Sequence, residues 1–285
     1  MGVDLRELGR ELARTDWSWV VAAMVIGLAG VYARAFRWRW LFPPGVEPTG
    51  IAAATMIGYM ANNVLPLRAG EVVRIYVLAR KLRESGYATG AEAFWLVTAT
   101  LVVERVLDSL AIVSMLAVLV LMIPVPRVVE WGAGILLVVD VVGVSALIAV
   151  ARAPDTCRRV LLRLTRRWPG ATRLSASIFE TGLRGLDGIR TPAHLPRIAV
   201  WTLAVWVLPA SAAWAMLRGV HLDLPFIAGW AVLAFVGVGI SVPSAPGYVG
   251  VFHASAVVPI TLAGWLYLLR EHVSLGEARR APTAA

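Results

Sequence analysis

Long apolar runs, separated by clusters of arginine, make up most of this sequence. Only 16% of its 285 residues are charged, against about 25% in a typical soluble domain. The runs that approach or exceed the length of about 20 residues needed to cross a bilayer are 17–32, 90–123, 128–150, 199–217, 226–242 and 249–269. The sequence therefore predicts an all-α fold, a polytopic membrane helix bundle, and leaves almost nothing for a separate soluble domain.

The apolar runs and the arginine clusters divide the chain into five predicted parts. These are an amphipathic N-terminal helix at 1–16, a first membrane half at 17–151, a basic loop at 152–197, a second membrane half at 198–270 and a polar tail at 271–285. The acidic residues of 1–16 favour a retained first helix over a removed signal peptide. The second half is short, because a further span of about 20 residues is expected between Val257 and Pro259.

The arginine-rich loop 152–197 sets the predicted orientation. Ten arginines against three acidic residues place this loop in the cytoplasm by the positive-inside rule. Counting back through the spans predicts that 80–83 and the N-terminus are also cytoplasmic. The same count puts Arg34, Arg37 and Arg39 on the outer side, unless that segment stays at the interface or the second apolar element is re-entrant. The leucines among the arginines of the loop predict amphipathic helices on an anionic leaflet, and the alternative is a solvated loop that only sets topology.

Charge and cysteine content narrow the possible partners. The net charge is +9 and nearly all the cations are arginine, which in an apolar chain favours the membrane and anionic lipid headgroups over nucleic acid. The single Cys157 excludes an intrachain disulfide, and neither a CxxC nor an HExxH spacing occurs. The sequence therefore predicts no metal and no cofactor.

The first polar segment lies at 58–81, where Pro66 and Gly70 interrupt an apolar element. The preceding run, 50–64, is too short to cross a bilayer, and broken backbone at membrane depth persists only where it lines a cavity. The polar residues placed there are Asn62, Asn63, Arg68, Glu71 and Arg74. Intramembrane charge predicts a functional site, and the alternative is a cluster of Arg68, Glu71 and Arg74 that only locks two helices together.

The second polar segment lies at 102–110. Glu104 and Asp108 are four residues apart and share a helix face, while Arg105 can neutralise Asp108. Two acids and one base leave a surplus of negative charge, which we expect an arginine of the first polar segment to balance. The alternative is that these residues face water near the interface.

The third segment, 240–253, repeats the spacing of the first. Pro243 and Gly247 are separated by three residues, as Pro66 and Gly70 are, which indicates a degenerate internal repeat with a second broken helix. Such paired interruptions are typical of a transporter site at a repeat interface. His253 is expected to be an interfacial or core histidine, or else a proton carrier.

Together the three segments resemble the transmembrane region of lysylphosphatidylglycerol synthases and the stand-alone flippase-like proteins of that superfamily. The matching motifs are Asn62-Asn63-x-x-Pro66-x-Arg68-x-Gly70-Glu71-x-x-Arg74, Glu104-Arg105-x-x-Asp108 and Pro243-x-x-Pro246-Gly247-x-x-Gly250. The resemblance covers nearly the whole chain. It implies re-entrant segments at both Pro/Gly motifs and a role in moving lipid-linked molecules across the inner membrane. Tyr248 and His253 depart from the family pattern, which has Gly and often Glu there.

Aminoacyl transfer in that family belongs to a separate soluble domain, and a glycosyltransferase would need a nucleotide-sugar site that the basic loop does not offer. We therefore expect no enzyme, but an inner-membrane flippase-like protein that binds and translocates an anionic phospholipid or lipid-linked intermediate. The alternative is a scaffold or accessory subunit for a partner enzyme that modifies lipids or glycans. The candidate lipid-binding residues are Asn62, Asn63, Arg68, Glu71, Arg74, Glu104, Arg105, Asp108 and His253, and the helix-breaking residues are Pro66, Gly70, Pro243, Pro246, Gly247 and Gly250.

Overall fold

A computed structural model describes residues 13–65, 69–122, 127–167 and 169–233. The predicted helix at 1–16 lies almost wholly outside these ranges, and the spans and motif after residue 233 lie outside them entirely. The described elements are all helices: α2 (Trp17–Arg39), α3 (Ile51–Val64), α4 (Gly70–Glu84), α5 (Gly90–Met122), α6 (Arg127–Arg152), α7 (Pro154–Thr165), α8 (Pro169–Gly185), α9 (Asp187–Arg190) and α10 (Leu195–Gly219). The predicted all-helical fold is confirmed.

Three described helices are long and apolar enough to cross a membrane. They are α2, the stretch Gly134–Arg152 of α6, and α10. Many of their large apolar side chains are exposed, including Val138, Val139 and Val142 on α6. Exposed apolar surface of this extent is suited to lipid, so the described helices form a membrane-embedded bundle.

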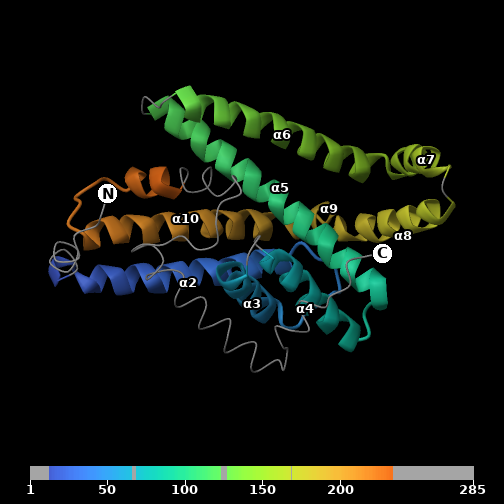
Figure 1. The fold of residues 1–285 in the computed structure, drawn as a ribbon, viewed down its shortest axis with the longest axis horizontal. Helices are drawn as coiled ribbons and strands as arrows, with labels where there is room; N and C mark the ends of the chain where they lie inside the picture. Colours follow the sequence, from blue (N-terminus) through green and yellow to red (C-terminus); the bar gives the residue numbers. More distant parts are fainter. Residues whose placement is uncertain (1–12, 66–68, 123–126, 168, 234–285) are drawn as a thin grey trace.

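Helices α2 and α10 form an antiparallel pair that runs side by side through the molecule (Figure 1). At one end the backbone N–H of Asp16 donates to the carbonyl of Gly219 at 2.9 Å. At the other end His194 Nδ1 lies 3.0 Å from the carbonyl oxygen of Trp40. The C-terminal end of α2 therefore lies beside the N-terminal end of α10.

Helices α3 and α4 form a short hairpin beside the C-terminal half of α2 (Figure 1). Their 14 and 15 residues give lengths of only about 21 and 23 Å, short of the bilayer's apolar thickness of about 30 Å. The two helices touch at Gly58 and Gly70, where a Cβ built on Gly70 would lie 2.0 Å from the carbonyl oxygen of Gly58. The predicted interruption is present, because α3 ends at Val64 and a separate helix begins at Gly70.

The structure shows which segments lie at the same end of the bundle. The two outer ends of the hairpin lie together, because a Cβ on Gly50 would be 3.5 Å from Cγ of Lys81. Gly188 of the basic loop lies against the backbone of Leu41, which follows α2, whereas Arg14 lies beside the other end of α10. The described start of α2 therefore lies at the opposite end of the α2–α10 pair from the basic loop, whereas the count of spans expected the two on one side. The arginines that end α2 lie at the same end of the bundle as the loop.

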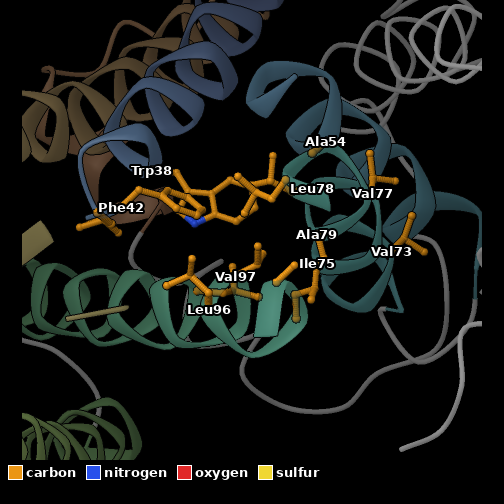
Figure 2. Packing of buried hydrophobic residues seen from close by; sticks show 14 of the residues in the cluster. Trp38, Phe42, Ala54, Val73, Ile75, Val77, Leu78, Ala79, Leu96 and Val97 are labelled. Atoms are coloured by element: carbon orange, nitrogen blue, oxygen red, sulfur yellow. The ribbon is translucent and has the colours of Figure 1, made fainter. Parts of the chain in front are cut away.

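A buried apolar core joins the end of α2 to the hairpin and to α5. Figure 2 shows Trp38 and Phe42 facing Leu78 of α4, with Leu96 and Val97 of α5 packed nearby. All five side chains are completely buried. The indole N–H of Trp38, the residue at the centre, donates to Thr100 Oγ1 at 3.1 Å. This core fixes the rotation of α2, α4 and α5 and thereby determines which of their polar residues meet.

The basic loop is helical, as predicted, but its two longer helices differ. Helix α8 packs against α5, and Arg184 pairs with Glu92 there. Helix α7 has no buried residue, and Val160 and Leu164 are exposed beside its arginines. The loop is thus partly built into the bundle and partly an exposed amphipathic helix.

Candidate functional site

Seven charged residues from three helices meet beside the start of α4. We call this group the ionic cluster; its members are Arg34 and Arg37 of α2, Glu71 and Arg74 of α4, and Glu104, Arg105 and Asp108 of α5. The helix break at Gly70 places the start of α4 against α5, and the Trp38 core holds α2 against both. Five of these seven residues are among the sequence-predicted site residues.

Glu104 lies at the centre of the ionic cluster and has no solvent exposure. Arg74 donates to both of its oxygens, from Nη1 to Oε1 at 3.2 Å and from Nη2 to Oε2 at 2.8 Å. Such bidentate, charge-assisted pairs are among the strongest polar contacts in proteins. The Arg74 guanidinium also lies 3.7 Å from the centre of the Trp38 ring. We call Arg74 and Glu104 the inner pair, and its presence confirms that an arginine of the first polar segment balances the acids of the second.

Asp108 is held by two arginines that the sequence analysis left out of the site. Arg34 Nη1 donates to Asp108 Oδ2 at 2.5 Å, and Arg37 Nη2 lies 2.7 Å from Oδ1. Arg34 and Arg37 are three residues apart, so they share one face of α2. This spacing in the last two turns of an apolar helix was the available signal. The sequence analysis did not use this spacing, because its count of spans placed Arg34 and Arg37 on the opposite side of the membrane from residues 80–83 at the end of α4.

These two arginines change the charge balance of the site. The sequence analysis expected an arginine of the first polar segment to balance the negative surplus of the second, but with Arg34 and Arg37 four arginines stand against three carboxylates, which leaves one positive charge among the described residues. Arg37 is completely buried, and its Nε and Nη1 have no hydrogen-bond acceptor in the part of the chain that the structure describes. An unbalanced buried cation is costly, so the ionic cluster is suited to receive an anion.

The outer edge of the ionic cluster is looser than its centre. The side chains of Glu71 and Arg105 are each 41% exposed, and Arg105 Nη1 lies 3.6 Å from Glu71 Oε1. Arg105 is also 3.6 Å from Glu104 and 3.7 Å from Asp108. These separations are longer than hydrogen bonds. We call Glu71 and Arg105 the outer pair. Glu71 and Arg74, which share a helix face in the sequence, thus take different partners.

The remaining candidate residues fall into two groups. Asn62 Oδ1 accepts a hydrogen bond of 2.8 Å from the backbone N–H of Gly70, so Asn62 caps the start of α4 across the break, and Asn63 follows it in the last turn of α3. Outside the described residues lie Pro66, Arg68, Pro243, Pro246, Gly247, Gly250 and His253. The structure therefore describes the first half-site only.

Comparison with known proteins agrees with this architecture. The chain is 26% identical to Glycosyltransferase AglD of Haloferax volcanii over 306 aligned residues, which cover 93% of this chain and 47% of that protein. It thus spans about half the length of this relative. No solved structure matches the chain. The family described as the lysylphosphatidylglycerol synthase TM region matches residues 1–265, and the chain belongs to that family.

Proposed function

We propose that this protein binds the phosphate of an anionic phospholipid or lipid-linked intermediate at the ionic cluster and lets the headgroup cross the membrane. The observation that carries the proposal is the positive surplus of the cluster inside an apolar bundle. An anionic headgroup supplies the charge that the cluster lacks, while exposed apolar helix faces such as that of α6 leave the acyl chains in lipid.

The geometry fits phosphate in particular. Arginine presents a planar set of donors that matches phosphate in a bidentate manner, and Arg105 offers such donors at the exposed edge. The break between α3 and α4 brings a helix N-terminus to the same place, where the helix dipole favours negative charge. A headgroup that enters there meets fixed, preorganised positive charge.

The protein acts in this proposal as a flippase-like membrane protein and not as an enzyme. Its similarity to Glycosyltransferase AglD covers less than half of that protein, so we do not carry the named activity of that relative over to this chain. The same partial match favours a second candidate, a membrane scaffold for a lipid- or glycan-modifying partner enzyme.

A flipping assay distinguishes the two candidates. The full chain is reconstituted in vesicles of phosphatidylcholine and phosphatidylglycerol with a trace of fluorescent phosphatidylglycerol, and dithionite reports the lipid that reaches the outer leaflet. We expect Arg105→Gln to slow the exchange about tenfold or more, the effect of one lost charge-assisted contact. Arg39→Gln is the matched control, because Arg39 is 45% exposed and lies outside the ionic cluster. Equal rates for wild type and Arg105→Gln would contradict the proposal and favour the scaffold.

We further propose that the basic loop lies on the cytoplasmic face of the inner membrane. The arginines that end α2, the lysine at the base of the hairpin and the loop all lie at one end of the bundle, and this arrangement satisfies the positive-inside rule. Cys157 is the single thiol of the chain and lies in exposed helix α7. A membrane-impermeant maleimide should therefore label it in permeabilised cells and not in intact ones.

A further inference from the structure

We infer that Glu71 is a displaceable substitute for the ligand: its carboxylate neutralises Arg105 in the empty site, and the phosphate of a lipid headgroup replaces it there. This inference rests on the proposed function and adds to it the order of events at the site. In this inference Glu104 and Asp108 stay paired with arginines throughout, and Glu71 is the carboxylate that a phosphate can replace.

Exposure separates the outer pair from the rest. Glu71 and Arg105 are the two members that reach solvent substantially in the described part of the chain, while the other five side chains are 14% exposed or less. A headgroup that approaches the ionic cluster therefore meets Glu71 and Arg105 first. The inner pair is out of reach until this edge opens.

Distances indicate that the outer pair is easy to separate. Arg105 makes no hydrogen bond to another described residue, and its three carboxylate neighbours lie 3.6–3.7 Å away. A guanidinium has five N–H donors, and none of those of Arg105 is engaged by a hydrogen bond to a described residue, which suits Arg105 to a bidentate phosphate. Because partly exposed ion pairs contribute little to stability, the exchange of Glu71 for phosphate requires little free energy.

The position of Glu71 lets its side chain leave without moving the helix. Glu71 lies in the first turn of α4, while Arg74, one turn further along, is bound to Glu104 at two points. The inner pair keeps α4 against α5 when the Glu71 carboxylate turns away. The dipole at the N-terminus of α4 then acts on the incoming anion instead.

The opposite role for Glu71 predicts the opposite result. If Glu71 contacts a cationic part of the headgroup, its removal weakens binding. If it competes with phosphate for Arg105, its removal strengthens binding of an anionic lipid. Whether removal of the Glu71 carboxylate raises or lowers the affinity for an anionic lipid therefore decides between the two roles.

The test measures binding of dioctanoyl phosphatidylglycerol to the detergent-solubilised full chain by isothermal titration calorimetry. We expect Glu71→Gln to lower Kd about two- to fivefold, the size of effect expected for an exposed ion pair. Glu84→Gln is the control, because it removes the same charge from the other end of α4, where Glu84 pairs with Arg80, and it should leave Kd unchanged. In an Arg105→Gln background, Glu71→Gln should have no effect on Kd. Melting temperatures confirm that each variant is folded.

Three results would overturn the inference while the proposed function stands: a higher Kd for Glu71→Gln, the same gain for Glu84→Gln, or a gain that persists without Arg105. Glycerol phosphate that competes as strongly as the lipid would overturn the assignment to a lipid headgroup. Wild type that binds dioctanoyl phosphatidylcholine as tightly as phosphatidylglycerol would overturn the proposed function and the inference with it.

Discussion

The inner pair and the outer pair of the ionic cluster consist of the same residue types on the same two helices, yet their geometry differs. Arg74 and Glu104 are buried and joined by two hydrogen bonds, whereas Arg105 and Glu71 are half-exposed and 3.6 Å apart. A buried pair that loses one partner leaves an unpaired charge in a medium that cannot solvate it. An exposed pair gives up little when it separates. The difference indicates that the inner pair holds the helices together and that the outer pair is available for exchange.

The largest effect is expected from breaking the inner pair. Glu104→Gln leaves Arg74 and Arg37 without their central carboxylate, which should lower the free energy of unfolding by about 3–5 kcal/mol. Glu104→Gln combined with Arg74→Gln should cost clearly less than the two single changes added together, because neither member of the inner pair is then left as a buried charge without the other. Thermal melts in detergent measure all three variants. Additive costs would mean that the inner pair does not act as a unit.

The next largest loss of stability is expected at Gly70, where the start of α4 touches α3 and positions both pairs. In Gly70→Ala the new methyl group would lie 2.0 Å from the carbonyl oxygen of Gly58 and 2.6 Å from Asn62 Oδ1. Backbone cannot yield cheaply, so the substitution should cost about 1–3 kcal/mol and move both Glu71 and Arg74. Gly27→Ala is the matched control, because a Cβ there meets nothing within 4 Å. If both variants melt at the same temperature, the two helices do not touch at Gly70.

Breaking the outer pair should scarcely affect stability. Arg105→Gln and Glu71→Gln should each change the free energy of unfolding by about 1 kcal/mol or less, because a partly exposed pair is screened by solvent. The same melts that detect the inner pair provide the comparison. A loss for Arg105→Gln as large as that for Glu104→Gln would show that the outer pair is structural and would remove the contrast between the two.

Some features of the two pairs could be predicted from local sequence patterns, and others could not. Glu104 and Asp108 are four residues apart, and Pro66 and Gly70 break an apolar run, so both the acidic face and the interruption were predictable. The presence of Arg34 and Arg37 in the site was not predictable, because it depends on whether residues 50–64 bring the chain back to the end of the bundle where α2 ends. It also depends on the rotation of α2 against α5, which the buried packing of Trp38 determines. The positive surplus of the site follows from that long-range packing, and the sequence analysis, which left Arg34 and Arg37 out of the site, did not predict it.

The smallest effect is expected at Asp16, a carboxylate at the other end of α2 whose hydrogen-bond partner is neutral. Ser18 donates to Asp16 Oδ1 from its backbone N–H at 3.0 Å and from its hydroxyl at 2.7 Å, and these bonds lower the pKa of Asp16 below its ordinary value of 3.8. A group whose pKa is lowered by folding contributes stability above its unfolded pKa and loses it as the pH falls through the folded value. Asp16→Ala should therefore melt slightly below wild type at pH 7.

The pH dependence of that difference identifies its cause. As the pH falls from about 5 to 3, wild-type Asp16 becomes protonated, so the gap in melting temperature between wild type and Asp16→Ala should narrow. Ser18→Ala, which removes the hydroxyl and keeps the backbone donor, should show a smaller gap at pH 7 that narrows over the same range. The difference in melting temperature between wild type and Asp16→Ala thus measures what a carboxylate that caps a helix at the surface contributes to stability. The effects of breaking the inner pair and the outer pair can be compared with that value. A gap that is equal at pH 3 and pH 7 would mean that the ionised carboxylate does not cap α2.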